Sequence, residues 1–164
     1  MEFFENYRKK YNDLLIAVEN FDISLSDEFY TSKSTNSDKI VKYQIRKFEV
    51  TFEMFLEQIK LYLICTHQKT SRSMASLIMS FHDSTHISET TYEILLEMSN
   101  YYRKMNLAYE EKNPNFNRTL FHKLETFYSI MLLCLKYLDY DDSDLYKSNK
   151  KRISLPIIKL VKEF

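Results

Sequence analysis

The sequence predicts an all-α protein, an antiparallel bundle of four to five helices. Apolar residues recur at steps of three and four positions along most of the chain, and no stretch of apolar–polar alternation marks a strand. The chain has 164 residues, of which 45% are hydrophobic, so it can bury a core without disulfides or metals. No apolar run approaches the roughly 20 residues that span a membrane. We therefore expect a folded protein outside the membrane.

The chain contains no glycine, and this excludes several function classes in their usual form. A dinucleotide-binding GxGxxG loop, a Walker A loop, a GxSxG nucleophile elbow and an EF-hand loop all require glycine at fixed positions. The formal net charge is +0, so no overall field attracts the protein to nucleic acid or anionic lipid. Any such binding needs a local patch.

The first helix is expected over about residues 3–21, because its apolar side chains form one stripe. The polar stretch 23–37 that follows predicts a long connection. The clearest helix is expected over about residues 39–66, with Ser37 or Asp38 available as its cap. Its apolar stripe has a seven-residue rhythm and consists of Val41, Ile45, Phe48, Phe52, Phe55, Ile59 and Tyr62.

Two further helices are expected in the middle of the chain. A short helix is predicted over about residues 72–82, followed by a polar break. Ser88 is predicted to cap the next helix, because Ile87 before it and Tyr92 after it stand where a hydrophobic staple would place them. That helix is expected to end near Glu111.

The last helix is expected over about residues 118–138, capped by Asn117 between the two staple positions Phe116 and Phe121. Residues 1–140 should then form the bundle. Residues 141–164 switch from acidic to basic and end in a short apolar segment, so they predict a charged linker and a tail.

The cysteines and histidines point to no metal site and no cofactor. Cys65 and Cys134 lie inside apolar helical patterns, which is typical of buried, reduced thiols. The four histidines do not pair with the cysteines at zinc-finger spacings. The first residues carry acids where a signal peptide has basic and then apolar residues, so we expect a cytoplasmic protein.

An acidic row follows the apolar stripe of the helix over residues 39–66. Glu49, Glu53 and Glu57 are successive i, i+4 neighbours, and like charges at that spacing repel unless cations answer them. Arg46 and Lys60 can supply part of that answer. Two interpretations stay open: a solvated face with local ion pairs, or an acidic groove wall that pairs with arginines of another helix or subunit.

The segment IRKFEVTFE, from Ile45 to Glu53, resembles the signature helix of the bacterial nucleotidyltransferase substrate-binding proteins, small helical bundles of the HEPN superfamily. The following parts come in a similar order: a short helix opening with serines, a loop, and a helix containing LLEMSNYYR. The resemblance covers about residues 4–138. It implies a HEPN-like bundle, a homodimer, and a separate nucleotidyltransferase subunit of the kind found in toxin–antitoxin or defence operons.

The same resemblance bears on catalysis through Arg103, which matches the arginine of the HEPN ribonuclease motif. That motif places a histidine five residues later and a tyrosine two further on, where this chain has Ala108 and Glu110, while Tyr109 is off by one. Alanine can neither take nor give a proton. The resemblance therefore implies a non-catalytic partner with a substrate- or partner-binding groove formed by Arg46, Glu49, Glu53, Arg103 and Tyr109. Arg103 then faces either a nucleotide phosphate, which it would bind weakly, or Glu49 and Glu53 of a packed helix.

Two alternatives remain beside this interpretation. The chain is a divergent HEPN ribonuclease toxin if Arg103 works with another base, such as Tyr109. It is a plain helical scaffold or interaction protein if it has no site, and Arg103 is then a surface arginine that lies over its aromatic neighbours.

Overall fold

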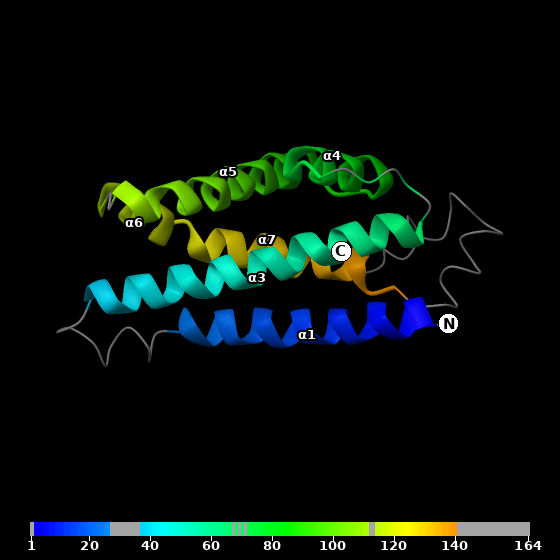
Figure 1. Ribbon diagram of the computed structural model, residues 1–164, viewed down its shortest axis with the longest axis horizontal. Helices are drawn as coiled ribbons and strands as arrows, with labels where there is room; N and C mark the ends of the chain where they lie inside the picture. The colour runs from blue at the N-terminus through cyan, green and yellow to red at the C-terminus, as the bar shows by residue number, and fades with distance from the viewer. Residues whose placement is uncertain are drawn as a thin grey trace.

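Six α-helices make up the part of the chain that the computed structural model describes, and none of these residues forms a strand. The described residues are 2–26, 37–66, 68, 70, 72–111 and 114–140, without the side chains of 2, 37–38, 106–111 and 114. The predicted all-α bundle is confirmed (Figure 1). Its helices are α1 (Glu2–Ser24), α3 (Ser37–Cys65), α4 (Met74–Ser84), α5 (Glu89–Glu111), α6 (Pro114–Phe121) and α7 (Leu124–Leu138).

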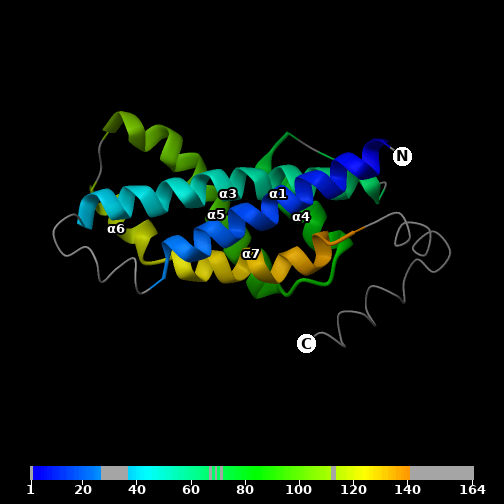
Figure 2. The same cartoon turned by 90° about the horizontal axis from the view of Figure 1, so that it is seen from below.

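The helices run roughly along one long axis. The helices α1 and α3 lie side by side in opposite directions, and α7 packs against both of them (Figures 1 and 2). The helices α4 and α5 follow one another along the other side of α3, and α5 also contacts α7. The short helix α6 sits at the end of the bundle where α3 begins, and it connects α5 to α7.

A column of phenylalanine rings from α3 forms the centre of the core. Phe48 and Phe52 stack with ring centroids 5.5 Å apart, and Phe52 and Phe55 stack at 6.1 Å. Phe127 of α7 lies 5.4 Å from Phe48, so the column joins two helices. All four rings are fully buried, which confirms the predicted apolar stripe of this helix. Buried aromatic rings contribute large apolar areas, so the column is a main source of stability.

Three buried polar side chains of α3 set its register against α1. They are spaced seven residues apart, so they share one face of the helix. Gln44 donates a hydrogen bond to the backbone oxygen of Ser24 at 2.6 Å, and Gln58 donates to that of Tyr7 at 3.2 Å. The Thr51 hydroxyl donates to the oxygen of Lys47 in its own helix at 2.6 Å and lies 3.4 Å from the oxygen of Ala17 in α1. A buried polar group without a partner is costly, so sliding either helix along the other would be penalised mainly at Gln44 and Gln58.

The predicted cap at Ser88 is confirmed. The backbone N–H of Thr91 donates to the Ser88 hydroxyl oxygen at 3.1 Å, and α5 follows with the expected bounds. Ile87, the residue before the cap, is buried.

The predicted single helix over residues 118–138 is wrong. The chain forms α6 and α7, with a break at His122 and Lys123, and Asn117 lies inside α6 instead of capping a helix. At the break, the N–H of Lys123 donates to the oxygen of Leu120 at 2.9 Å, a bond that spans three residues instead of four. Apolar side chains stay on the core side across this tightened turn, so the periodicity of the sequence hides it. The missed signal is Pro114, because proline favours the first position of a helix.

Two predicted segments fall partly or wholly outside the described residues. The expected connection 23–37 overlaps the end of α1, and residues 27–36 lie outside the described residues. The predicted linker and tail, 141–164, also lie outside them. In the ranges that are described, no helix is both long enough and apolar enough to cross a membrane.

Candidate functional site

The predicted groove residues lie on two helices. Arg46, Glu49 and Glu53 belong to α3, whereas Arg103 and Tyr109 belong to α5. The side chain of Tyr109 is outside the described residues.

Two carboxylates of the acidic row of α3 form ion pairs with cations of the same chain. The Arg46 Nη1 lies 2.7 Å from Oε1 of Glu49, whose side chain is only 12% exposed. The Lys10 Nζ of α1 lies 3.4 Å from Oε1 of Glu57. Exposed pairs of this kind contribute about 0 to 1 kcal/mol each. The two end carboxylates of the acidic row, Glu49 and Glu57, are therefore each paired with a cation. This agrees with the interpretation of a face with local ion pairs.

Tyr102 is the residue of α5 that faces the acidic row. Its ring centroid lies 5.6 Å from that of Phe52. Burial raises the pKa of the Tyr102 hydroxyl, and the negative charges of Glu53 and Glu49 raise it further. The Tyr102 side chain beside the acidic row is thus a neutral phenol.

Arg103 lies elsewhere on α5. It is exposed, and its Nη2 donates to Oδ1 of Asn100 on the same helix at 3.4 Å. Asn100 lines a cavity between α5 and α6, so Arg103 contacts a lining residue of that cavity without lining it itself. Among the described side chains, Arg103 forms no ion pair with Glu49 or Glu53.

The cavity between α5 and α6 was not foreseen from the sequence. It has a volume of about 430 Å³ and opens to solvent. Ligand-binding clefts commonly measure about 300 to 1,000 Å³. Its lining includes, among the described residues, Glu97, Asn100, Tyr101, Lys104, Asn115, Phe116 and Thr119. The four from α5 follow the i, i+3, i+4, i+7 spacing of one helix face, which is the signal that the sequence did contain.

Aromatic rings form the floor of this cavity. Tyr101 and Phe116 are half-buried, and their centroids lie 5.5 Å apart. Tyr101 also lies 5.8 Å from the buried ring of Phe127, which fastens the floor to the core. At one wall Lys123 donates to the carboxylate of Glu97, and this hydrogen bond raises the pKa of the lysine.

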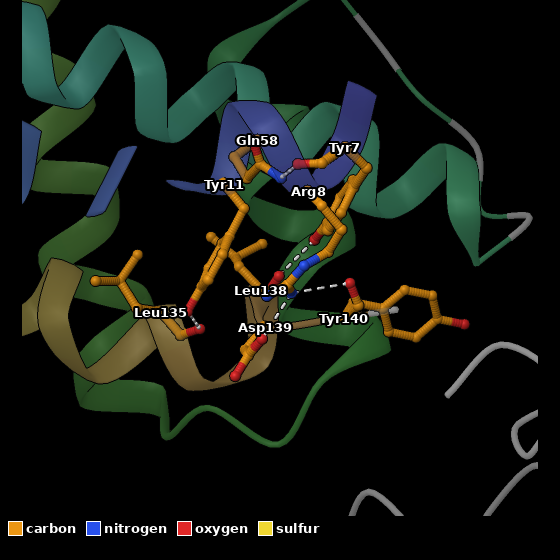
Figure 3. Close-up of polar contacts among 8 residues, drawn as sticks. All are labelled: Tyr7, Arg8, Tyr11, Gln58, Leu135, Leu138, Asp139 and Tyr140. Carbon is orange, nitrogen blue, oxygen red and sulfur yellow. Dashed lines mark hydrogen bonds and ion pairs between the residues drawn. The ribbon is translucent and has the colours of Figure 1, made fainter. Parts of the chain in front are cut away.

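A second polar cluster joins the first turns of α1 to the end of α7 (Figure 3). The Tyr7 hydroxyl donates to the oxygen of Leu138 at 2.7 Å, and the Tyr11 hydroxyl donates to the oxygen of Leu135 at 3.2 Å. Arg8 Nη1 donates to Oδ1 of Asp139 at 2.7 Å, and to the backbone oxygen of Tyr140 at 3.2 Å. The last carbonyls of a helix lack the usual intrahelical partner, so Tyr7 supplies a donor to the oxygen of Leu138. The oxygen of Leu135 accepts from the N–H of Asp139 as well as from Tyr11.

This cluster is structural in character. Burial raises the pKa of Tyr11 to about 12 and raises that of Tyr7 still further. Both hydroxyls are therefore neutral donors near pH 7 and unsuited to proton transfer there. The apolar spacing of the sequence had marked Tyr7 and Tyr11 only as core residues, and nothing in it showed that their hydroxyls reach α7.

The described thiols and imidazoles are not grouped into a candidate site. Cys65 and Cys134 are buried, and burial raises the pKa of Cys134 to about 12, far from the range of a reactive thiolate. His82 stacks on Tyr92 with centroids 4.4 Å apart, and its Nε2 lies 3.3 Å from Oε2 of Glu89. Among the residues whose positions are described, no three His, Cys, Asp or Glu side chains are grouped as a metal site requires.

The chain is thus an all-α helical bundle with an acidic row on α3 and an aromatic-floored cavity between α5 and α6. No family model matches the chain, and no curated protein and no solved structure matches it. The likeness to the nucleotidyltransferase substrate-binding proteins stays a prediction from the motif in α3.

Proposed function

We propose that this chain is a non-catalytic helical partner protein, similar to the substrate-binding subunit of a small separate nucleotidyltransferase in a toxin–antitoxin or defence-type pair. The observation that carries the proposal is the outward face of α3. Tyr43, Val50 and Ile64 are exposed there by 44%, 41% and 43%. They stand at intervals of seven and fourteen residues, so they form one row along the helix.

Charged side chains flank this apolar row. Glu57 stands in the row itself, seven residues from both Val50 and Ile64. A parallel row with the same seven-residue spacing consists of Arg46, Glu53 and Lys60. Apolar residues at heptad spacing with flanking charges are typical of a helix that packs against a helix of another chain. The face therefore favours a protein partner: a second copy of the chain, with the nucleotidyltransferase assembled on the dimer.

The non-catalytic part of the proposal rests on the motif in α5. Ala108 stands at the position where the HEPN ribonucleases carry their histidine, and no other titratable group takes that position. Arg103 keeps a guanidinium that binds phosphate oxygens without any base beside it.

Sedimentation equilibrium at tens of micromolar tests the first assembly step. We expect a homodimer, and we expect Val50→Lys to shift it towards monomer because the substitution puts a charge in the centre of the row. Ile23→Lys is the matched control, since Ile23 is also exposed but lies on α1. A monomeric wild-type chain, or equal effects of the two substitutions, would contradict a role of the α3 face in dimerisation.

The second step is tested by mixing the purified chain with the small nucleotidyltransferase encoded beside it. We expect the two to co-elute in size-exclusion chromatography. Separate elution at tens of micromolar, or the lack of any such neighbouring gene, would contradict the partnership.

A further inference from the structure

The cavity between α5 and α6 has three kinds of surface arranged in order. The two aromatic residues of the floor are half-buried, whereas Asn100, Asn115 and Thr119 are exposed at its rim. Lys104 is exposed one turn beyond Asn100 on α5. A ligand in this cavity therefore meets an apolar ring surface, amide and hydroxyl groups, and a cation.

The charges of the cavity favour an anion at the Lys104 end. Glu97, the carboxylate among the described lining residues, forms an ion pair with Lys123, which lies between α6 and α7. No carboxylate among the described residues pairs with Lys104. Arg103 does not line the cavity, but it donates to the lining residue Asn100, so a second cation stands next to this part of the site. Lysine and arginine side chains hold phosphate groups as point charges and forks respectively.

The aromatic floor favours a flat ring system. Faces of tyrosine and phenylalanine bind nucleobases by stacking, irrespective of base identity. Side-chain amides present both donors and acceptors, as the edge of a heterocyclic base does. The volume of about 430 Å³ is in the range of small-molecule clefts.

We infer that the α5–α6 cavity binds a nucleotide, with the base on Tyr101 and Phe116 and the phosphate at Lys104. The ligand is a free mononucleotide or the accessible nucleotide of a single-stranded RNA, which share this chemistry. The inference deepens the proposed function and rests on it for the role of the bound nucleotide as substrate; the geometry of the cavity itself does not depend on it.

The test is a titration of the full ¹⁵N-labelled chain, followed by NMR, with AMP and its two fragments. Adenosine lacks the phosphate and ribose 5-phosphate lacks the base. We expect AMP to bind at least about tenfold more tightly than either fragment, because each half of the cavity then contributes. A five-nucleotide oligoadenylate is the fourth probe: tighter binding than AMP identifies RNA as the source, and equal or weaker binding identifies the free nucleotide.

Substitutions at two lining residues test which end of the cavity binds the phosphate and which binds the base. Lys104→Ala should weaken AMP binding about tenfold and leave adenosine binding unchanged, and Lys104→Arg should restore AMP binding. Phe116→Leu keeps an apolar side chain but removes the ring, so it should weaken both AMP and adenosine. Lys9→Ala, at an exposed lysine of α1, is the matched control and should change neither. Thermal unfolding of each variant checks that it folds. If Phe116→Leu does not fold, Lys104→Ala and Lys104→Arg decide the question alone.

Several results would overturn the inference. They are the absence of saturable AMP binding at millimolar concentration, equal binding of AMP and ribose 5-phosphate, and equal effects of Lys104→Ala and Lys9→Ala. Failure of the proposed function is seen separately, because a chain that binds AMP in this way but does not co-elute with a nucleotidyltransferase keeps the cavity site and loses the partnership.

Discussion

The hydroxyl of Tyr7 donates a hydrogen bond of 2.7 Å to the backbone oxygen of Leu138, 131 residues further along the chain. Gln58 of α3 donates to the backbone oxygen of the same Tyr7 at 3.2 Å (Figure 3). One residue of α1 is therefore bonded to α3 through its main chain and to the end of α7 through its side chain. Three helices meet at this position.

We expect Tyr7→Phe to lower the free energy of unfolding by about 1 to 3 kcal/mol, because a buried carbonyl loses its donor. Tyr11→Phe should cost less, since its hydrogen bond is longer and the oxygen of Leu135 also accepts from the N–H of Asp139 at 3.0 Å. Urea unfolding measures both. A larger loss for Tyr11→Phe would contradict this ranking.

Alkaline pH should destabilise the bundle through the same tyrosines. Burial raises the pKa of Tyr11 from its ordinary value of 10.0 to about 12. Between those values the unfolded chain has released a proton that the folded chain still holds, so stability falls as pH rises. The contribution is fully present below about pH 10 and is lost as pH rises through about 12.

Urea midpoints at pH 8, 10 and 11 test this dependence. Tyr11→Phe should lose less stability than the wild type between pH 8 and 11, because it lacks the titrating hydroxyl. Parallel profiles for wild type and Tyr11→Phe would argue against a buried Tyr11 hydroxyl.

Phe52→Ala should cost about 3 to 5 kcal/mol, by the lost transfer free energy and the cavity that remains in the aromatic column. Glu57→Ala should cost under about 1 kcal/mol, because its pair with Lys10 is half-exposed. Similar urea midpoints for the two variants would mean that the ring column does not hold the core together.

The purified chain should not cleave RNA, because Ala108 supplies no general base or acid. Arg103→Ala should weaken nucleotide or RNA binding, with a reduced dependence on salt. In the HEPN motif an asparagine usually follows the arginine, where this chain has Lys104. The double change Lys104→Asn with Ala108→His therefore rebuilds part of that motif, and slight cleavage is the most we expect from it, since Glu110 stays at the tyrosine position. Metal-independent cleavage by the unaltered chain, abolished by Arg103→Ala, would instead establish the ribonuclease alternative.

Local signals were sufficient for much of the fold. The stripe of α3 and the cap at Ser88 depend on residues within one or two helical turns, and both are confirmed. The break between α6 and α7 was missed because Leu120, Leu124 and Phe127 keep facing the core across a turn tightened by a single hydrogen bond. Periodicity measures which residues face the core, and it is insensitive to such a change in backbone direction.

The candidate site depended on contacts that a sequence pattern does not contain. Gln44, Thr51 and Gln58 belong to the edge of an apolar stripe, and only the packing of α1 shows that they are buried. The α5–α6 cavity likewise requires α6 to be a separate helix. The acidic row was visible in the sequence, whereas its neighbour on α5 is Tyr102 and not Arg103.

The bond between Tyr7 and Leu138 also has a consequence for synthesis of the protein. Ribosomes add roughly 5 to 20 residues per second, so the two partners emerge on the order of ten seconds apart. During that interval the first turns of α1 lack the helix end that completes their burial. Nascent chains halted before residue 138 should therefore offer the ring of Tyr7 and its neighbours Phe3 and Phe4 to chaperones, even when α1 and α3 have already paired.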